Sequence, residues 1–243
     1  MILFFGDVHG SFRHVRRVVD EHGPEAIVFL GDLEAQQPLE KELADVVDKT
    51  DVWWIPGNHD TDSKANYENL FESALADRNL HGRIVEIDGV RVAGLGGVFR
   101  EKIWYPDPVD ALALYESYAD YCKQSEPGRI QDAQRKRAVR NGSPNPAVAG
   151  LLLKHRSSIF YRDWFDLYGQ QADILVTHEA PDCHRHGFSV IRNLAESMHA
   201  KFSFHGHHHV HYRREFDSFT AHGVGFRAVT DMYGGIILPG EAG

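Results

Sequence analysis

The sequence predicts an α/β fold: a four-layer αββα sandwich of two mixed β-sheets flanked by helices, with one helical insertion. Continuous apolar runs alternate with helical patterns in the first half of the chain, which is typical of strands buried on both faces of a sheet. Later segments have hairpin and strand-pair patterns, which indicate a second sheet. Polar segments directly follow several apolar runs, at the position where open α/β sheets usually bind ligands.

The first half of the chain divides into three strand–helix units. The first expected helix has apolar residues at helical spacing, such as Phe12, Val15 and Val19. Pro38 begins the second, at a position where a missing amide hydrogen is tolerated. The expected strands span 2–5, 26–30 and 52–55, and the expected helices span 11–22, 38–48 and about 63–76.

Further strands are expected in the second half of the chain. Residues 83–87 and 90–95 flank an Asp88-Gly89 turn, which predicts a β-hairpin. Further strands are expected at 173–177, at 201–205, after His211 and at 235–238. This mixture of helices, buried strands and strand pairs suits a two-sheet αββα sandwich.

Residues from about 98 to 168 interrupt this pattern, and we interpret them as a helical insertion in a single domain of residues 1–243 that covers one side of the pocket. Helices are expected at 107–123, at 129–140 and from 147 to about 165, with a loop at 141–146. Between Arg100 and Asp163 there are 11 Lys and Arg against 8 Asp and Glu. This excess forms either a cationic rim for an anionic substrate or a solvated helix face. Arg100, at a strand end, is the basic residue we expect to face the pocket.

Five short segments contain carboxylates, imidazoles and one carboxamide, the oxygen and nitrogen donors that first-row divalent metals select. Four of them follow expected buried strands, so the fold can bring them into one pocket. The segments are Asp7-Val8-His9, Gly31-Asp32, Gly57-Asn58-His59-Asp60, His178 and Gly206-His207-His208-His209.

The order and form of these segments resemble the calcineurin-like metallophosphoesterase family, a superfamily of dinuclear metal phosphoesterases. The family pattern runs Asp-x-His, Gly-Asp, Gly-Asn-His-Asp/Glu, His, Gly-His-x-His, and all five parts are present here. The resemblance implies two metal ions that share Asp32, with His59 as the catalytic histidine and Asp60 as the carboxylate that orients it. It implies Asp7, His9, Asp32 and His209 as the ligands of one ion, and Asp32, Asn58, His178 and His207 as the ligands of the other.

The chemistry of phosphoester hydrolysis accounts for these residue types. Two cations roughly 3.5–4 Å apart bind the phosphoryl oxygens and lower the pKa of a bound water to about 7, so that a metal-bridging hydroxide can attack. The Asp32 carboxylate can offer one oxygen to each ion, and Asn58 adds a ligand without adding charge. His59, as an imidazole, can donate a proton to the leaving oxygen near physiological pH. Ligands without a thiolate suit Mn²⁺ or Fe, and Zn²⁺, Ni²⁺ and Mg²⁺ are not excluded.

Three of these segments also have a structural interpretation that involves no metal. Asp7 could cap the helix that follows it, and Gly-Asn-His-Asp is good turn chemistry. The histidines at 205–211 could form a surface patch, and we assign no function to His205, His208 and His211. Alternation along a strand would place His207 and His209 on one face and His208 on the other.

The sequence lacks the two arginines that protein serine/threonine phosphatases carry beside Gly-Asp and Gly-Asn-His. Those arginines would hold a phosphomonoester dianion through paired hydrogen bonds. The first hypothesis is therefore hydrolysis of a phosphodiester or phosphomonoester bond in a small molecule. The alternatives are a protein Ser/Thr-type phosphatase or nuclease of the same superfamily, and a non-catalytic metal-binding interaction module.

The composition limits partners and location. A formal charge of −9 argues against general binding to nucleic-acid backbones. Hydrophobic content of 42%, no stretch of ~20 apolar residues and no basic N-terminal leader give no sign of a membrane span or signal peptide. Two cysteines are too few for a disulfide framework, so we expect a cytoplasmic protein. The expected partner is a phosphorylated small molecule, with no membrane and nucleic acid disfavoured.

Overall fold

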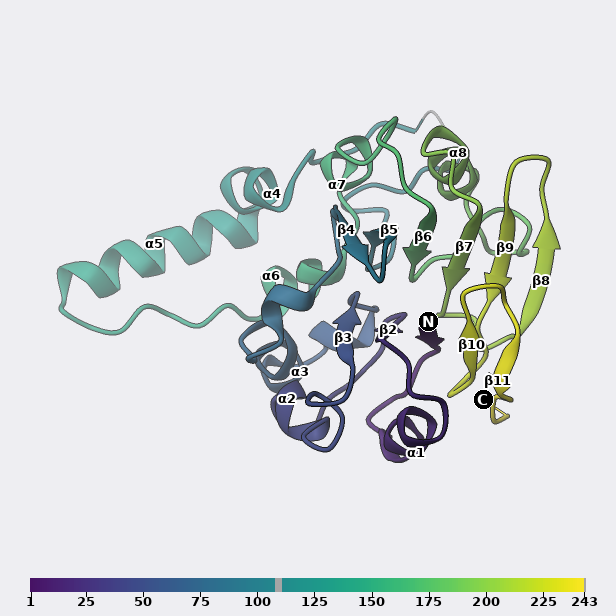
Figure 1. Cartoon of the computed structure of the whole chain (residues 1–243). Helices are drawn as coiled ribbons and strands as arrows, with labels where there is room; N and C mark the ends of the chain where they lie inside the picture. The colour runs from purple at the N-terminus through teal and green to yellow at the C-terminus, as the bar shows by residue number, and fades with distance from the viewer. Residues whose placement is uncertain (108–110, 243) are drawn as a thin grey trace.

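Two β-sheets pack face to face between helices in the computed structural model, which describes residues 1–107 and 111–242 (Figure 1). One sheet has the order β11-β10-β1-β2-β3, and the other has the order β4-β5-β6-β7-β9-β8. The first contains β1 (Ile2–Phe5), β2 (Ala26–Phe29), β3 (Asp51–Trp54), β10 (Val229–Asp231) and β11 (Ile236–Leu238). The second contains β4 (Arg83–Ile87), β5 (Val90–Leu95), β6 (Ile174–Thr177), β7 (Phe202–His205), β8 (Tyr212–Glu215) and β9 (Thr220–Gly223).

Both sheets are mixed: antiparallel strands flank the parallel ones at one edge of the first sheet and at both edges of the second. Strands β1, β2 and β3 run parallel, and so do β5, β6, β7 and β9. Strand β10 pairs antiparallel with β1, and β4 and β8 form the antiparallel edges of the second sheet. The predicted hairpin is confirmed, and Asp88 and Gly89 both have positive φ as its two-residue turn requires. These mixed sheets confirm the predicted αββα sandwich.

Three apolar clusters hold the four layers together. Between the sheets, Phe4 of β1 stacks on Phe204 of β7 with ring centroids 4.1 Å apart. A second cluster joins the first sheet to the helices below it in Figure 1, and a third joins the other sheet to the helices above it. The lower helices are α1 (Arg13–His22), α2 (Leu39–Glu42) and α3 (Lys64–Phe71), and the upper ones are α7 (Tyr161–Phe165) and α8 (Ser189–Ser197).

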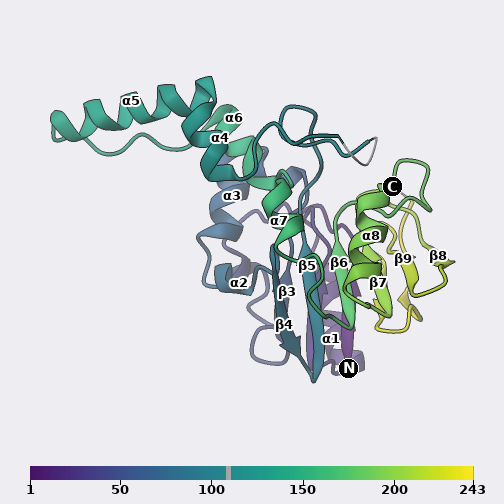
Figure 2. The same ribbon diagram turned by 90° about the horizontal axis from the view of Figure 1, so that it is seen from above.

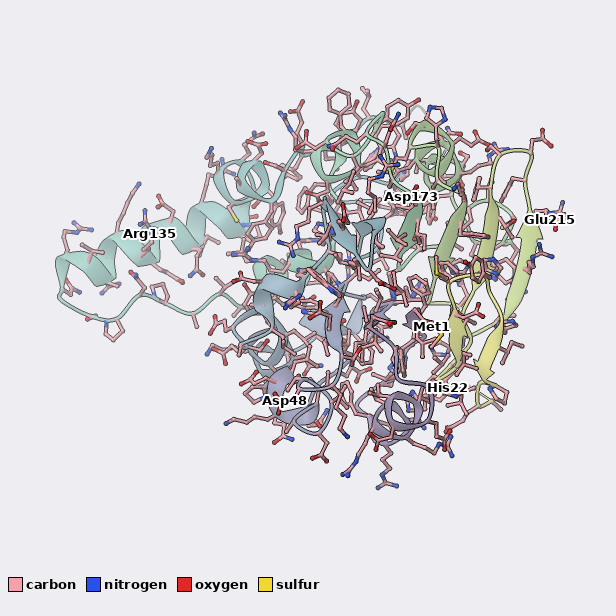
Figure 3. The ribbon with its side chains drawn as sticks, viewed as in Figure 1. Met1, His22, Asp48, Arg135, Asp173 and Glu215 are labelled. Carbon is pink, nitrogen blue, oxygen red and sulfur yellow. The ribbon has the colours of Figure 1, made fainter. Side chains whose placement is uncertain are left out.

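The insertion contains α4 (Tyr118–Gln124), α5 (Glu126–Arg140) and α6 (Gly150–Lys154). Helix α5 extends away from the sandwich in both ribbon views (Figures 1 and 2). Its side chains, including Arg135, point outward along most of its length (Figure 3). Helix α5 therefore projects from the body of the sandwich instead of lying over it.

Several expected helices are shorter than the sequence indicated. Residues 38–48 form only α2 followed by turns, and 63–76 form α3 followed by turns and a 3₁₀ helix at Ala76–Arg78. Within 107–123 the helix begins at Tyr118, because Ser117 caps it by accepting a hydrogen bond from Asp120 N at 3.2 Å; residues 108–110 lie outside the described part. The expected helix from 147 to 165 is divided into α6, a 3₁₀ helix at His155–Ser157 and α7.

This division has a clear cause. Val98 N donates to Ser157 O at 3.0 Å, and Ile159 N donates to Val98 O at 3.0 Å. The backbone at Ser158 is therefore extended against Val98, where a continuous helix could not pair with it. The same contact brings the two ends of the insertion together beside the strand ends. In the described residues, no helix is long and apolar enough to cross a membrane.

Candidate metal centre

The first group of predicted ligands is Asp7, His9 and His209. Asp7 follows β1 and is 1% exposed. His209 Nε2 lies 3.1 Å from Asp7 Oδ2 and 3.1 Å from His9 Nε2. One ligand-capable atom from each of the three residues lies within 4.8 Å of the others. This geometry suits a single small cation.

The second group is Asp32, His178 and His207, which meet the same distance criterion. His178 Nε2 lies 3.4 Å from Asp32 Oδ2 and 3.2 Å from Asn58 Oδ1. The same Asp32 oxygen lies 4.0 Å from His9 Nε2 in the first group. Asp32 therefore stands between the two groups.

The hydrogen bonds of the imidazoles show that the groups fit cations. His178 Nδ1 is 2.8 Å from Leu30 O, and a carbonyl only accepts, so Nδ1 donates and neutral His178 has a lone pair on Nε2. That lone pair faces two further acceptors, the oxygens of Asp32 and Asn58. Three such groups facing one another need a positive charge between them, which either a proton on Nε2 or a bound cation supplies. Divalent cations bound by nitrogen and oxygen donors satisfy this requirement.

The electrostatics agree. Burial lowers the pKa of His178, but the adjacent Asp32 carboxylate outweighs burial and raises it to about 10. Burial raises the pKa of Asp32, but His178 holds it below its usual range. Negative charge in this buried place thus strongly favours a positive partner.

Glycines of the ligand segments allow their close approach. A Cβ on Gly57 would lie 2.2 Å from Asp32 Oδ1, and a Cβ on Gly206 would lie 2.1 Å from Asp7 Oδ1. Neither carboxylate could keep its position beside a larger residue. Gly57 and Gly206 are therefore required by the close packing around these two carboxylates.

The histidine loop after β7 differs from its expected form. His207 and His209 are in the left-handed region, with φ of 67° and 57°, and lie outside any strand. They still both belong to the ligand groups, while the His208 ring stacks on His184 with centroids 3.8 Å apart. The expected placement of His208 on the side opposite His207 is wrong: outside a strand there is no alternation, and the two rings lie with centroids 4.8 Å apart. One ligand-capable atom each of His207, His208 and Glu179 lies within 4.8 Å of the others. Asp7 does not cap the following helix, since its carboxylate accepts from His207 N at 2.9 Å.

The carboxylate that contacts His59 is not the expected one. His59 Nδ1 lies 2.6 Å from Asp62 Oδ2. Asp60 is fully buried and accepts from Gly57 N and Glu34 N, each at 2.8 Å. Because both Asp60 oxygens bind backbone amides, the expected contact between Asp60 and the His59 ring is corrected to Asp62. Asp60 instead joins two ligand segments.

Sequence reasoning missed three further carboxylates near the centre. Glu34 hydrogen-bonds His9 Nδ1, Asp62 bonds His59, and buried Glu179 has an oxygen 3.9 Å from His207 Nε2. Burial raises the Glu179 pKa to about 7. Each of the three lies one to three residues from a motif residue in the sequence. That proximity was the available signal, but it does not show which way a side chain points.

The Arg100 guanidinium is held by residues at the far end of the insertion. Its Nη1 donates to Ser157 O at 2.8 Å and Ser158 Oγ at 3.0 Å. Burial lowers the pKa of Arg100, and the charges of Asp62, Glu179 and Asp32 oppose that shift. The guanidinium is therefore fixed by the insertion within the field of the site carboxylates.

Comparison with known proteins agrees with this centre. A model of the family described as calcineurin-like phosphoesterase matches residues 1–211. An uncharacterized protein of Haemophilus influenzae is 40% identical over 240 residues, which are 98% of this chain and 96% of that protein. The crystal structure of TT1561 from Thermus thermophilus is 14% identical with a TM-score of 0.55, covering 96% of this chain and 94% of that one.

The crystal structure of phosphopantetheinyl hydrolase (PptH) from Mycobacterium tuberculosis is 17% identical with a TM-score of 0.50, covering 93% of this chain and 89% of that one. At these identities the two solved structures show a shared fold. The family match extends from β1 to the histidine loop and so includes every predicted ligand. The chain belongs to the calcineurin-like phosphoesterase family and is a metallophosphoesterase.

Proposed function

We propose that this protein hydrolyses phosphodiester or phosphomonoester bonds in a small molecule, using two divalent metal ions. The observation that carries the proposal is the position of Asp32 Oδ2, 3.4 Å from His178 Nε2 and 4.0 Å from His9 Nε2. One carboxylate within reach of both ligand groups is what a shared ligand of two ions requires. The proposed ligands are Asp7, His9, Asp32, Asn58, His178, His207 and His209.

Two bound divalent ions would supply positive charge for the phosphoryl oxygens and would lower the pKa of a water molecule near neutrality. The protein holds the ligands on strand ends, with Asp7, Asp32 and His178 almost fully buried. Asn58 supplies a neutral oxygen, which limits the negative charge that would repel a phosphate. These residues bind and orient; they do not themselves exchange protons with the substrate.

His59 is the proposed proton donor to the leaving oxygen. Its Nδ1 is engaged by Asp62, and its side chain is 45% exposed. The hydrogen bond orients the ring and leaves Nε2 for the substrate. His59 N also donates to Asp32 Oδ1 at 2.8 Å, which keeps the ring beside the shared carboxylate.

Arg100 is the proposed binding residue for a phosphoryl oxygen, in place of the absent arginine pair. It comes from the insertion at 98–168, which we propose is part of one domain covering residues 1–243. Mn²⁺ or Fe suits the mixed nitrogen and oxygen ligands best, and Zn²⁺, Ni²⁺ and Mg²⁺ are alternatives. A cytoplasmic location and a phosphorylated small-molecule partner complete the proposal.

Turnover with Mn²⁺ tests the proposal. Metal-free protein would be reconstituted with Mn²⁺ and assayed on bis-aryl and mono-aryl phosphates, then on cyclic nucleotides, nucleotides, phosphopeptides and oligonucleotides. We expect hydrolysis of the aryl esters and of at least one small substrate, and chelation should abolish it. Turnover of phosphopeptides or oligonucleotides alone would favour a protein phosphatase or nuclease, and no turnover on any substrate would favour a non-catalytic binding module.

A further inference from the structure

Glu34 has no assigned role, yet its carboxylate contacts a proposed metal ligand. It hydrogen-bonds His9 Nδ1, and because a carboxylate accepts, Nδ1 is the donor. The neutral His9 ring therefore has its lone pair on Nε2. That nitrogen is the one that faces His209 and Asp7 in the first ligand group.

The backbone of Glu34 is held in a conformation that side chains rarely adopt. Its φ is 46°, in the left-handed region, and such conformations persist only where surrounding contacts enforce them. Here Glu34 N donates to the buried Asp60 Oδ1 at 2.8 Å, and Glu34 O accepts from Gln36 Nε2 at 2.8 Å. The strain at Glu34 is thus maintained on both sides of the residue.

The surrounding segments are tied together by the same contacts. Asp60 also accepts from Gly57 N, so it joins the segment after β2 to the segment after β3. His9 N donates to Asp32 O at 3.0 Å, and Gly10 N donates to Leu33 O at 2.9 Å, which joins the segment after β1. The carboxylate of Glu34 is consequently presented to His9 by a rigid framework.

We propose that Glu34 is a positioning residue for His9, and that Asp60 keeps Glu34 in place through its backbone amide. Glu34 fixes the orientation of the ring and keeps the proton on Nδ1, so that Nε2 faces the metal. The inference rests on the proposed two-metal function. Partners of this kind typically change metal affinity about 10–100-fold when removed.

Metal binding to Glu34→Ala tests this directly, without an activity assay. Mn²⁺ would be titrated into metal-free protein and followed by calorimetry and electron paramagnetic resonance. We expect the Mn²⁺ affinity of the site formed by Asp7, His9 and His209 to fall by ~10–100-fold. The affinity of the second site should change little. In a His178→Ala background, which removes a ligand of the other site, the same weakening should appear in the remaining site.

Two further variants separate positioning from charge. Glu34→Gln removes the charge but keeps an oxygen that can accept from Nδ1, so it should bind Mn²⁺ more tightly than Glu34→Ala. Glu40→Ala is the matched control: its carboxylate accepts from Ala74 N at 3.1 Å, outside this framework, and should leave both affinities unchanged. Equal losses in Glu34→Gln and Glu34→Ala, or equal losses at both sites, would overturn the proposal.

Glu34→Gly separates positioning from folding. Glycine adopts positive φ without strain, so metal-free Glu34→Gly should melt at a higher temperature than Glu34→Ala. Both should nevertheless lose the same Mn²⁺ affinity, because both lack the carboxylate. If affinity instead follows thermal stability across the two variants, Glu34 acts through folding alone and the proposal fails.

Asp60→Asn tests the second half of the proposal. An amide offers one accepting oxygen, so it cannot bind Gly57 N and Glu34 N together. We expect Asp60→Asn to bind Mn²⁺ more weakly at the His9 site. In the double variant Asp60→Asn with Glu34→Ala, little further loss of affinity is expected, because the Glu34 carboxylate is already absent. Full additivity of the two losses would show that Asp60 does not act through Glu34. If wild-type protein binds two ions but hydrolyses nothing, the proposed function fails while this inference stands.

Discussion

The loops that carry the predicted metal ligands and helix α5 differ in how far they are buried and in how many contacts they make with other segments. In the loops, Asp7, Asp32, Asp60 and His178 are at most 2% exposed, and their polar atoms are bonded to other segments. In α5 only Gly128 is buried, and Val139 is 67% exposed. The loops are irregular and locally strained, yet tertiary contacts hold them; α5 is regular, yet little outside it holds it. Regular secondary structure is therefore a poor guide to rigidity in this protein.

This contrast predicts the largest effects at the residues of the ligand loops that carry the centre. The largest is expected for Asp32→Asn, because one oxygen of Asp32 serves both ligand groups. The affinity for both metal ions should fall by more than about 100-fold, the upper loss expected for removing a residue that only hydrogen-bonds a ligand. Turnover should disappear. Metal analysis after gel filtration checks this. Two tightly bound ions in the variant would contradict the shared role.

His59→Gln should affect chemistry without affecting metal binding. Loss of a proton donor typically reduces turnover by ~10²–10⁴-fold. Two ions should remain bound, since no ligand is removed. Steady-state kinetics together with metal analysis distinguish this outcome from loss of the centre. Unchanged kcat would remove His59 from the mechanism.

Gly128→Ala is the strongest change expected in the insertion. A Cβ at this position would lie 1.9 Å from Cys122 O, so the start of α5 would be forced away from α4. Overpacking of this kind costs about 1–3 kcal/mol. Limited proteolysis should cut the insertion faster, while Mn²⁺ affinity stays the same. Gln134→Ala, on an exposed part of α5, is the control and should show normal proteolysis.

Asp62→Asn should have the smallest effect. The pair of Asp62 with His59 is exposed, and such pairs contribute about 0.2–1 kcal/mol. We expect kcat to fall about two- to fivefold and metal content to remain unchanged. A loss as large as that of His59→Gln would mean that Asp62 does more than orient the ring.

The sequence predicted the layers of the fold because central strands such as β1, β2 and β6 are almost entirely apolar. It also indicated that predicted ligands from four segments would lie close together, since each of these segments follows the end of a strand. It did not predict the limits of α2, α4 and α6, where a cap or a single strand-like bridge decides the boundary. Helix α8 was not anticipated.

The partners of the ligands were less predictable than the ligands. Asp60 and Asp62 are two residues apart, and composition cannot distinguish which one reaches His59. The choice depends on the 3₁₀ helix at His59–Thr61, which turns Asp60 inward to two backbone amides. Glu34 is similar, because its contact with His9 depends on a positive φ that glutamate rarely adopts.

The contact between His9 and His209 joins residues 200 positions apart. Contacts of such long range form late in folding, because the loop between them must first be closed. The first ligand group is consequently complete only after nearly the whole chain has been synthesised and both sheets have packed together. A metal ion that binds only this completed arrangement stabilises the native state over any partly folded one. Bound metal would then raise the melting temperature of the folded protein.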